Sequence, residues 1–425
     1  MKTINSALGL VITFISLLYG CSGNIKRGNS EISREDELTG YFAGMQDVCM
    51  DSLEPLCGVV PDSTFHVEID VKDLYLVDAA TLFKAERVVK LETNRECLIG
   101  EIDKIVYADS IFFILDRDLA KAVYAFDNNG RFISQIGYAG RGPEEYIEPT
   151  DIFYDEEHKY LTVWDQFSHR FVAYTADGQF VDDMSIPLRF LHCEKVPADS
   201  TLWCSIMWNN SIQQLNGYQL AKIDYKANSV INKSDYNPLV MNYIPEGSNM
   251  RVLNNKVFYH PQFNDTIFSV FRNTIAPEYI FSFKNVENLP DNLMEICNGD
   301  YEKFMELYRE AGVGYFENDF LVTEKNLYAE ISVANQVITI RYNKETGKVS
   351  VMLPQIYAAP FSENLTQVCN LVWGTLNSTT YSEGVLISPI NCSLLKYLSR
   401  EEREYFELLD IDEDDNPVIF FFKEI

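Results

Sequence analysis

The chain has 425 residues, of which 47% are hydrophobic and 13% aromatic. This is enough apolar material for a large core. The formal net charge is −28, from 35 basic and 63 acidic residues. A field of this sign repels phosphate groups and anionic lipids. Nucleic acids and anionic membrane surfaces are therefore not expected as partners.

The first twenty residues have the pattern of a secretory signal peptide. Lys2 precedes an apolar run from Ala7 to Leu18 that is too short for a membrane span. The run leads into Leu18-Tyr19-Gly20-Cys21, which resembles the lipobox of bacterial lipoproteins. The resemblance implies cleavage before Cys21 and attachment of lipid to its thiol; an ordinary secretory signal is the alternative. We expect residues 21–60 to be a flexible tether and leading segment, with the lipid as the only membrane anchor.

Eight of the nine cysteines remain if Cys21 carries the lipid. In an exported chain they could pair, and Cys49 with Cys57 is the closest candidate. No CxxC spacing occurs, so the sequence supports neither a zinc site nor a CxxC redox dithiol. We expect most of these thiols to be buried as small hydrophobic groups.

An internal repeat is visible in the first half of the chain. FFILDRDLAKAVYAFDNNGRFISQI, from Phe112, aligns with LTVWDQFSHRFVAYTADGQFVDDMSI, from Leu161. Each copy contains an apolar strand that ends in Asp (Asp116 or Asp165), an alternating strand, and an Asn-Gly or Asp-Gly hairpin turn. The spacing of the two copies is near the length of one four-stranded propeller blade.

The same plan continues downstream and predicts an all-β fold, a six-bladed β-propeller over residues 61–425. Its innermost strands are expected to begin near Lys104, Thr150, Phe190, Arg251, Tyr315 and Thr366. An N-terminal strand, either FHVEID from Phe65 or ERVVKL from Glu86, would close the last blade. Two helical insertions are expected, YEKFMELYREAG after Asp300 and SLLKYLSREEREYFELL from Ser393.

The stretch QIGYAGRGPEEY, residues 135–146, lies between two predicted blades. Its glycines and proline suit a sharp crossing from an outermost strand to the next innermost strand. The crossing would deliver its carboxylates towards the axial mouth, where ligands collect on this fold. The candidate ligand-binding residues are Arg141, Glu144, Glu145, Tyr146 and Asp151. The alternative is that Arg141 and one of the glutamates simply brace the loop.

IGYAGRGPEEY followed by TDIFYD resembles the IGxxGxGPxEY…D signature of NHL-like six-bladed β-propeller lipoproteins of Gram-negative bacteria, which are largely of unknown function. VVKLETNRECLIGEIDKIVYADSIFFILD, FNDTIFSVFRNTIAPEYIFSF and DEDDNPVIFFFK are further similar stretches. The resemblance covers roughly residues 65–425. Glu144 stands where the family often has glycine. The resemblance implies a fold and a compartment, and it assigns no catalytic residue.

No catalytic motif is recognisable in the sequence. We therefore expect a binding module of the cell envelope, facing the periplasm or the cell surface, with a small molecule, a glycan or an envelope protein as partner. We expect a monomer without a cofactor. The alternative is a metal-dependent lactonase, hydrolase or lyase that holds Ca²⁺ with axial carboxylates, which only fold analogy supports. A structural role in an envelope complex is a third hypothesis.

Overall fold

The computed structural model describes residues 53–77, 81–196, 201–207, 210, 212–226, 229–234, 248–261, 263–333, 336–352, 376, 378–397, 403, 406–407 and 409–425. All of them belong to one of the two compact units of the chain, Val48–Ile425. The predicted signal peptide, the lipid-attachment residue Cys21 and Cys49 lie outside the described residues.

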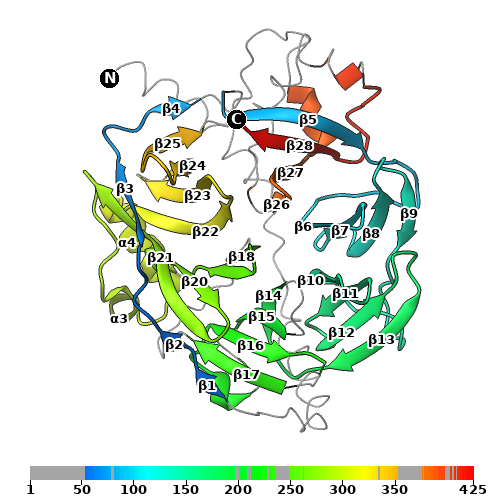
Figure 1. Ribbon diagram of the computed structural model, residues 1–425, viewed down its shortest axis with the longest axis horizontal. Coiled ribbons are helices and arrows are strands. Elements are labelled where there is room, and N and C mark those ends of the chain that lie inside the picture. The colour runs from blue at the N-terminus through cyan, green and yellow to red at the C-terminus, as the bar shows by residue number, and fades with distance from the viewer. Residues whose placement is uncertain are drawn as a thin grey trace. The chain divides into compact units, whose positions relative to one another are not determined.

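Six sheets surround a common centre, and the predicted six-bladed β-propeller is confirmed (Figure 1). The strands are given from the centre outward. Blade 1 consists of β6 (Lys104–Ala108), β7 (Ile111–Asp116), β8 (Ala122–Asp127) and β9 (Phe132–Gln135), and blade 2 consists of β10 (Asp151–Asp155), β11 (Tyr160–Asp165), β12 (Arg170–Tyr174) and β13 (Phe180–Ser185). Blade 3 consists of β14 (Phe190–Lys195), β15 (Thr201–Ile206), β16 (Leu220–Asp224) and β17 (Ser229–Ser234).

Blades 4 to 6 follow the same plan. Blade 4 consists of β18 (Met250–Leu253), β19 (Lys256–Tyr259), β20 (Thr266–Phe271) and β21 (Thr274–Lys284). Blade 5 consists of β22 (Tyr315–Val322), β23 (Asn326–Val333), β24 (Gln336–Asn343) and β25 (Val349–Met352). Blade 6 begins with β26 (Thr380–Ser382), β27 (Val385–Ile390) and β28 (Val418–Glu424). Five innermost strands begin within one residue of the predicted position. The sixth begins at Thr380, and Thr366 lies outside the described residues.

The two repeated aspartates hold equivalent turns. Buried Asp116 accepts hydrogen bonds from the main-chain N–H of Gly100 (2.6 Å), in the loop that enters blade 1, and of Ala120 (2.8 Å), in the turn after β7. Buried Asp165 accepts in the same way from Ile147 N–H (2.6 Å), in the loop that enters blade 2. A carboxylate at the end of the second strand therefore joins two loops whose N–H groups would otherwise lack a partner.

The strand that completes blade 6 comes from near the start of the described chain. β5 (Phe83–Lys90) pairs antiparallel with β28 as the outermost strand. Of the two sequence alternatives, the segment from Glu86 is therefore the closing strand. FHVEID forms β3 (Phe65–Asp70) instead, and it pairs parallel with β21 of blade 4.

Residues 54–77 form a segment that we call the N-terminal strap. β1 (Glu54–Pro55) pairs parallel with β17. β2 (Cys57–Gly58) and β3 both pair parallel with β21, and β4 (Leu76–Val77) pairs parallel with β25. The strap thus borders blades 3, 4 and 5 in turn, as the blue ribbon in Figure 1 shows. It adds a strand to three sheet edges that would otherwise be open.

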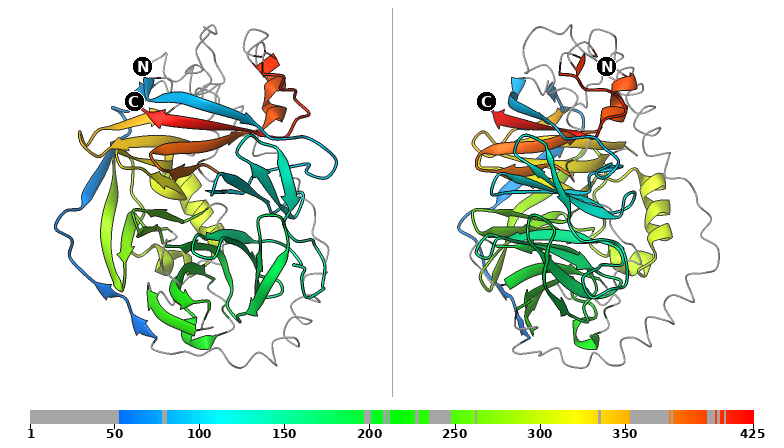
Figure 2. Two further views of the ribbon diagram at one scale, coloured as in Figure 1. Left: turned by 45° about the vertical axis from the view of Figure 1, so that its right-hand side comes forward. Right: turned by 90° about the vertical axis from the view of Figure 1, so that its right-hand side faces the viewer.

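Two α-helices lie between blades 4 and 5, α3 (Leu293–Cys297) and α4 (Tyr301–Ala311). Asp300 caps α4 by accepting from Glu302 N–H, and Gly312 ends it in the left-handed region, as predicted. The right-hand view of Figure 2 shows α4 on one face of the ring. The described residues also form the 3₁₀ helices η2 (Gln213–Leu215) and η4 (Cys392–Tyr397). Within the described ranges, no helix is long and apolar enough to cross a membrane.

Candidate functional site

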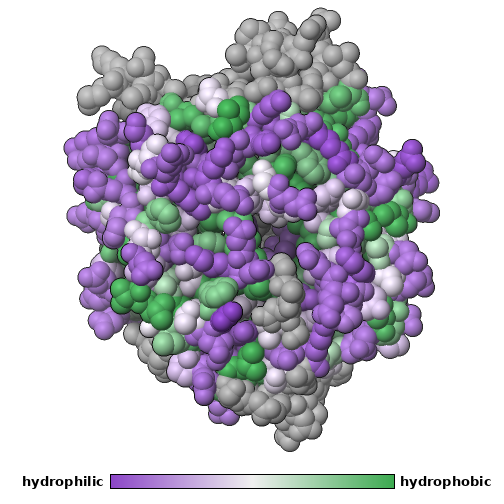
Figure 3. Space-filling view, viewed as in Figure 1, coloured by the Kyte–Doolittle hydropathy of each residue, from purple (hydrophilic) through white to green (hydrophobic). Residues whose placement is uncertain are grey.

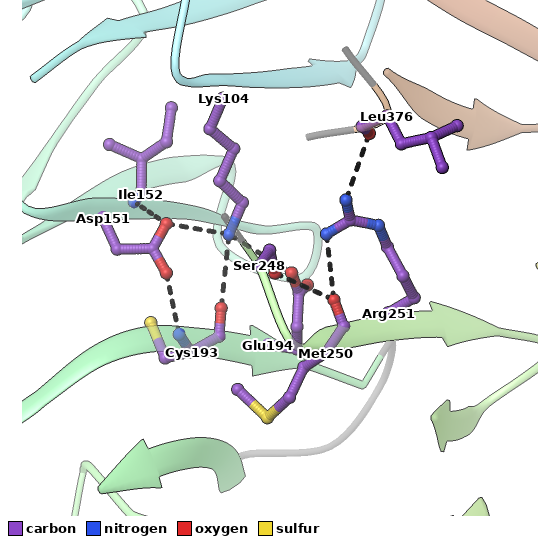
Figure 4. Close-up of polar contacts among 9 residues, drawn as sticks. All are labelled: Lys104, Asp151, Ile152, Cys193, Glu194, Ser248, Met250, Arg251 and Leu376. Carbon is purple, nitrogen blue, oxygen red and sulfur yellow. Dashed lines mark hydrogen bonds and ion pairs between the residues drawn. The ribbon is translucent and has the colours of Figure 1, made fainter. Parts of the chain in front are cut away.

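Ionic side chains from different blades meet where the innermost strands converge. The ammonium of Lys104, at the start of β6, lies 2.9 Å from Asp151 Oδ1 and 3.3 Å from Glu194 Oε1. It also donates a hydrogen bond to the carbonyl oxygen of Cys193 (3.3 Å). Figure 4 shows these groups pointing towards one another from β6, β10 and β14. Closure of the ring brings together charges that are distant in sequence.

Asp151 is held in place by main-chain donors. Its Oδ2 accepts from Cys193 N–H (2.7 Å), on the neighbouring blade, and its Oδ1 accepts from Ile152 N–H (2.8 Å). The residue is only 1% exposed. The carboxylate therefore has a fixed orientation, and it positions the Lys104 ammonium that binds to it.

Arg251, near the start of β18, provides the second cation. Its Nη1 donates to Met250 O (3.0 Å) and its Nη2 donates to Leu376 O (3.2 Å), as Figure 4 shows. Burial lowers the pKa of Arg251, and the carboxylates of Asp319 and Glu194 oppose this effect. The guanidinium thus lies within the electrostatic reach of two blades besides its own.

Blade 5 adds three carboxylates. The pairing of β22 with β23 shifts between Phe316 and Phe320, so that an extra segment bulges from the innermost strand. The bulge carries Glu317 and Asp319 beside Glu330 of β23. We call these three carboxylates, together with Lys104, Asp151, Glu194 and Arg251, the axial cluster.

Burial and neighbouring charges shift the pKa values of other members of the cluster. Burial lowers the pKa of Lys104, but Asp151 and Glu194 more than compensate, and the net pKa lies above its ordinary value. Burial raises the pKa of Glu194, against the opposing effect of Lys104. Burial raises the pKa of Glu317 to about 7, although hydrogen bonds from Tyr315 and Ser332 oppose the shift. The pKa of Glu330 is also raised, by burial first and then by Asp319 and Glu317.

Three other titratable groups, those of Asp103, Arg117 and His192, border the cluster. Arg117, after β7, pairs with Asp103 (3.1 Å), and burial raises the pKa of this carboxyl to about 6 despite the guanidinium. Burial lowers the pKa of His192 to about 4, with Asp151 opposing, so this imidazole is neutral at pH 7. The space-filling view in Figure 3 is hollowed near the centre of the ring, with hydrophilic residues lying deep in it. A polar group that enters from solvent would therefore meet ionic partners.

The structure separates the residues that the sequence proposed as ligand contacts. Of the five, Asp151 belongs to the axial cluster. Arg141 and Glu144 are exposed in the crossing loop, and Tyr146 is fully buried, donating to Ile136 O (3.1 Å). Glu145 accepts a hydrogen bond within the same loop. Of these side chains, Glu145 braces the loop, and a role of the five residues in ligand binding remains a prediction.

The crossing loop also shows why its glycines are needed. The carboxylate of Glu145 accepts from Gly142 N–H (2.7 Å) and occupies the space that a Cβ atom at Gly140 would take. Gly137 has a φ of 63°, and a Cβ there would lie 2.5 Å from the Tyr174 hydroxyl. The glycines therefore permit a compact loop braced by one glutamate.

Sequence reasoning missed most of the axial cluster. Lys104 and Arg251 were used as the predicted starts of innermost strands, but not as site residues. The available signal is an ionic side chain within the first two residues of an innermost strand, which occurs in β6, β10 and β18. Glu194, near the end of β14, does not share it. Glu317 and Asp319 gave no comparable signal, because a bulge changes which side chains face the centre.

Among the described residues, one group has three possible metal ligands within 4.8 Å of one another: Asp155, Glu157 and His158. It does not include the axial carboxylates. The Asp155 carboxylate lies 2.8 Å from the Lys195 ammonium and accepts from the Tyr225 hydroxyl (2.9 Å). Because a lysine already neutralises it, this group suits an ion-pair network better than a metal ion.

The fold and the cluster define the class: the protein is a six-bladed β-propeller with paired ionic side chains at the centre of its ring. A family model described as "Domain of unknown function (DUF4934)" matches residues 63–423, so the chain belongs to this family. None of the curated proteins matches the chain.

Similar structures have been solved for proteins of Gram-negative bacteria. A Bacteroides fragilis protein, named as a candidate exported protein, is 20% identical; the match covers 85% of this chain and 99% of that chain, with a TM-score of 0.69. A DUF4221 family member from Bacteroides vulgatus is 10% identical, over 81% and 100% of the chains, with a TM-score of 0.48. BamB from Moraxella catarrhalis is 12% identical, over 80% and 99%, with a TM-score of 0.37. The first likeness supports the fold.

Proposed function

We propose that the protein is a lipid-anchored module of the bacterial cell envelope that binds a small polar ligand at its axial cluster. The observation that carries the proposal is the convergence of Lys104, Asp151 and Glu194 from three blades, with contacts of 2.9 and 3.3 Å. The lipobox at Cys21 supports the anchor. The name of the Bacteroides fragilis protein supports export. The NHL-like lipoprotein resemblance points to the same compartment.

The chemistry of the cluster favours a ligand with hydroxyl and ionic groups. Cations lie on blades 1 and 4 and carboxylates on blades 2, 3 and 5, and Lys104 contacts two carboxylates at once. A sugar with a carboxylate substituent could bind the guanidinium of Arg251. A sugar with an amino substituent could exchange with Lys104 at Glu194 while Asp151 keeps its contact with Lys104, so that no charge is left unpaired. Half-buried charges interact more strongly than exposed ones, so such an exchange would discriminate between ionic and neutral sugars.

The proposal can be tested by thermal unfolding of the mature protein with glucosamine, glucuronic acid or glucose as probes. We expect an ionic sugar to raise the Tm, as ligands that bind only the folded state do. The triple variant Lys104→Met/Asp151→Asn/Glu194→Gln removes the cation together with both carboxylates that contact it, so no charge is left buried alone, and it should abolish the shift. Lys121→Met, which removes a surface ion pair with Glu148, is the matched control. An equal shift in all variants, or an equal effect of glucose, would contradict the proposal.

A metal-dependent lactonase, hydrolase or lyase is the second candidate, and the blade 5 carboxylates are the observation that favours it. Carboxylate oxygens are the ligands that Ca²⁺ prefers. A carboxyl with a pKa near 7, such as that of Glu317, also suits a general acid or base. The ligand atoms of these three side chains are not among the groups of the described residues that lie close enough together to hold a metal ion. Stoichiometric metal in the purified protein, with a Tm that falls on chelation, would favour this candidate. A third outcome, a protein partner, would appear as co-purification from detergent-solubilised membranes.

A further inference from the structure

Two buried cysteines lie opposite each other beside the axial cluster. Cys193 in β14 and Cys204 in β15 are direct partners in the antiparallel register. Both are fully buried, both are free thiols, and both belong to the same hydrophobic core. They are separated by eleven positions in sequence, so their relationship is invisible to a search for CxxC spacing.

Antiparallel geometry places this pair within bonding reach. Directly opposite residues have Cα atoms about 4.5 or 5.5 Å apart, and their side chains point to the same face of the sheet. Disulfides form across Cα separations of roughly 4.4–6.8 Å. We propose that Cys193 and Cys204 form a cross-strand disulfide when the chain folds in an oxidising compartment.

The oxidant in this reaction is a small-molecule disulfide, for which oxidised glutathione is a suitable probe. A thiolate from one cysteine attacks the disulfide and releases one glutathione thiol; the second cysteine then displaces the other. The two cysteine thiols lose two electrons and two protons, and oxidised glutathione becomes two molecules of the thiol. The reaction belongs to folding rather than to the folded state, because the closed sheet shields both sulfur atoms and burial raises the pKa of both thiols.

The position gives the bond a consequence for the cluster. The N–H of Cys193 donates to Asp151 and its carbonyl oxygen accepts from Lys104. A covalent link to β15 would fix the segment of β14 that holds both of these groups. The inference does not depend on the proposed ligand, since it concerns only the state of two thiols.

The test compares the full mature chain refolded with a glutathione redox buffer and with a reductant. Free thiols are alkylated with iodoacetamide, and the protein is digested with trypsin without reduction. Cleavage after Arg189, Lys195 and Lys222 gives two peptides, residues 190–195 and 196–222, with one cysteine each. We expect them as one linked species, lighter by two hydrogen atoms than their sum, in the oxidised sample only. Exposed Cys57 should escape alkylation, either as a glutathione adduct or as a disulfide with Cys49, which confirms that the oxidant acted.

Two variants and one physical measurement complete the test. Cys193→Ala should abolish the linked species, whereas Cys97→Ala, which alters a buried thiol in a different core, should retain it. The oxidised protein should also unfold at a Tm several degrees above that of the reduced protein, because the bond restricts the unfolded chain. If both peptides are alkylated in the oxidised sample while Cys57 escapes alkylation, or if Cys193 is linked to a different cysteine, the proposal is overturned.

Discussion

Glu317 has a pKa of about 7 in the folded protein, against an ordinary value of 4.5, because burial disfavours its charged form. Between these two pH values the folded state retains a proton that the unfolded state releases. The free energy of unfolding should therefore fall as the pH rises from about 4.5 to 7, and the contribution of Glu317 should stay constant above that range. Glu330, whose pKa is also raised, acts in the same direction.

The variant Glu317→Gln cannot ionise, so it should lose less stability over this range than the unmodified protein, by roughly 1–3 kcal/mol. Urea unfolding at pH 5 and pH 8 measures the difference. Glu324→Gln, at an exposed position between β22 and β23, is the matched control and should leave the pH dependence unchanged. If the free energy of unfolding changes with pH equally in Glu317→Gln and in the unmodified protein, this carboxyl is not protonated in the folded state.

A second residue-scale prediction concerns the crossing loop. In Gly140→Ala, the new Cβ atom would overlap the carboxylate of Glu145, which is held by Gly142 N–H. We expect a loss of roughly 1–3 kcal/mol in urea unfolding, because either the side chain or the loop must move. Adding Glu145→Ala to Gly140→Ala should restore part of the lost stability, because the overlapping carboxylate is gone. If the effects of the two substitutions on the free energy of unfolding simply add, the contact between residues 140 and 145 is refuted. Gly58→Ala meets nothing within 4 Å and should be neutral.

At the level of elements, the strap contributes apolar side chains to the core as well as strands to the edges. Val67 and Ile69 of β3 are fully buried in the core that blades 4 and 5 share, and Phe65 stacks on Tyr279 with ring centroids 5.2 Å apart. β3 therefore packs across two blades. The two-residue strands β1, β2 and β4 make only short pairings on either side of it.

Substitutions at two valines of the strap, one buried and one exposed, test whether β3 packs in the core. Val67→Ala removes buried methyl groups and should lower the free energy of unfolding by roughly 1–3 kcal/mol. Val60→Ala, at a residue that is 96% exposed, should change it by less than about 0.5 kcal/mol. Urea unfolding of both variants measures the difference. Equal effects would mean that β3 does not pack as the structure shows.

The sequence predicts the long elements and misses the short ones for a physical reason. The strands that begin at Lys104 or Phe190 carry apolar side chains and lie between turns, so their pattern is local. β1 and β4 have two residues each, too few for any periodicity, and only the neighbouring blade makes them strands. The axial cluster is hidden for a similar reason. Its members meet only after the ring closes, and the register shift next to Glu317 depends on pairing that the sequence does not reveal.

At the scale of the whole molecule, β5 joins the two ends of the propeller. Phe83 is 1% exposed and packs near Tyr328 of blade 5 and Phe422 of blade 6, with ring centroids 5.7 and 6.4 Å away. At the other end of the strand, Val89 belongs to the core shared with blade 1. One strand therefore contributes to the packing of three blades. In a closed ring each blade has two neighbours, so loss of this strand would expose two blade faces at once.

This arrangement predicts that a destabilising substitution in β5 also destabilises the blades on the opposite side of the ring. Phe83→Ala should lower the free energy of unfolding by about 3–5 kcal/mol, the usual cost of removing a buried phenyl ring. Of the four tryptophans, Trp164 and Trp203 lie in β11 and β15 of blades 2 and 3, strands that are distant from β5 in Figure 1. The measurement uses a background with Trp208→Phe and Trp373→Phe, so that only these two indoles are observed. If the ring unfolds cooperatively, the urea midpoint should shift equally by tryptophan fluorescence and by far-UV circular dichroism, since both probes then report one transition. If the fluorescence midpoint stays in place while the dichroism midpoint falls, the blades unfold separately, and closure by β5 stabilises only its neighbours.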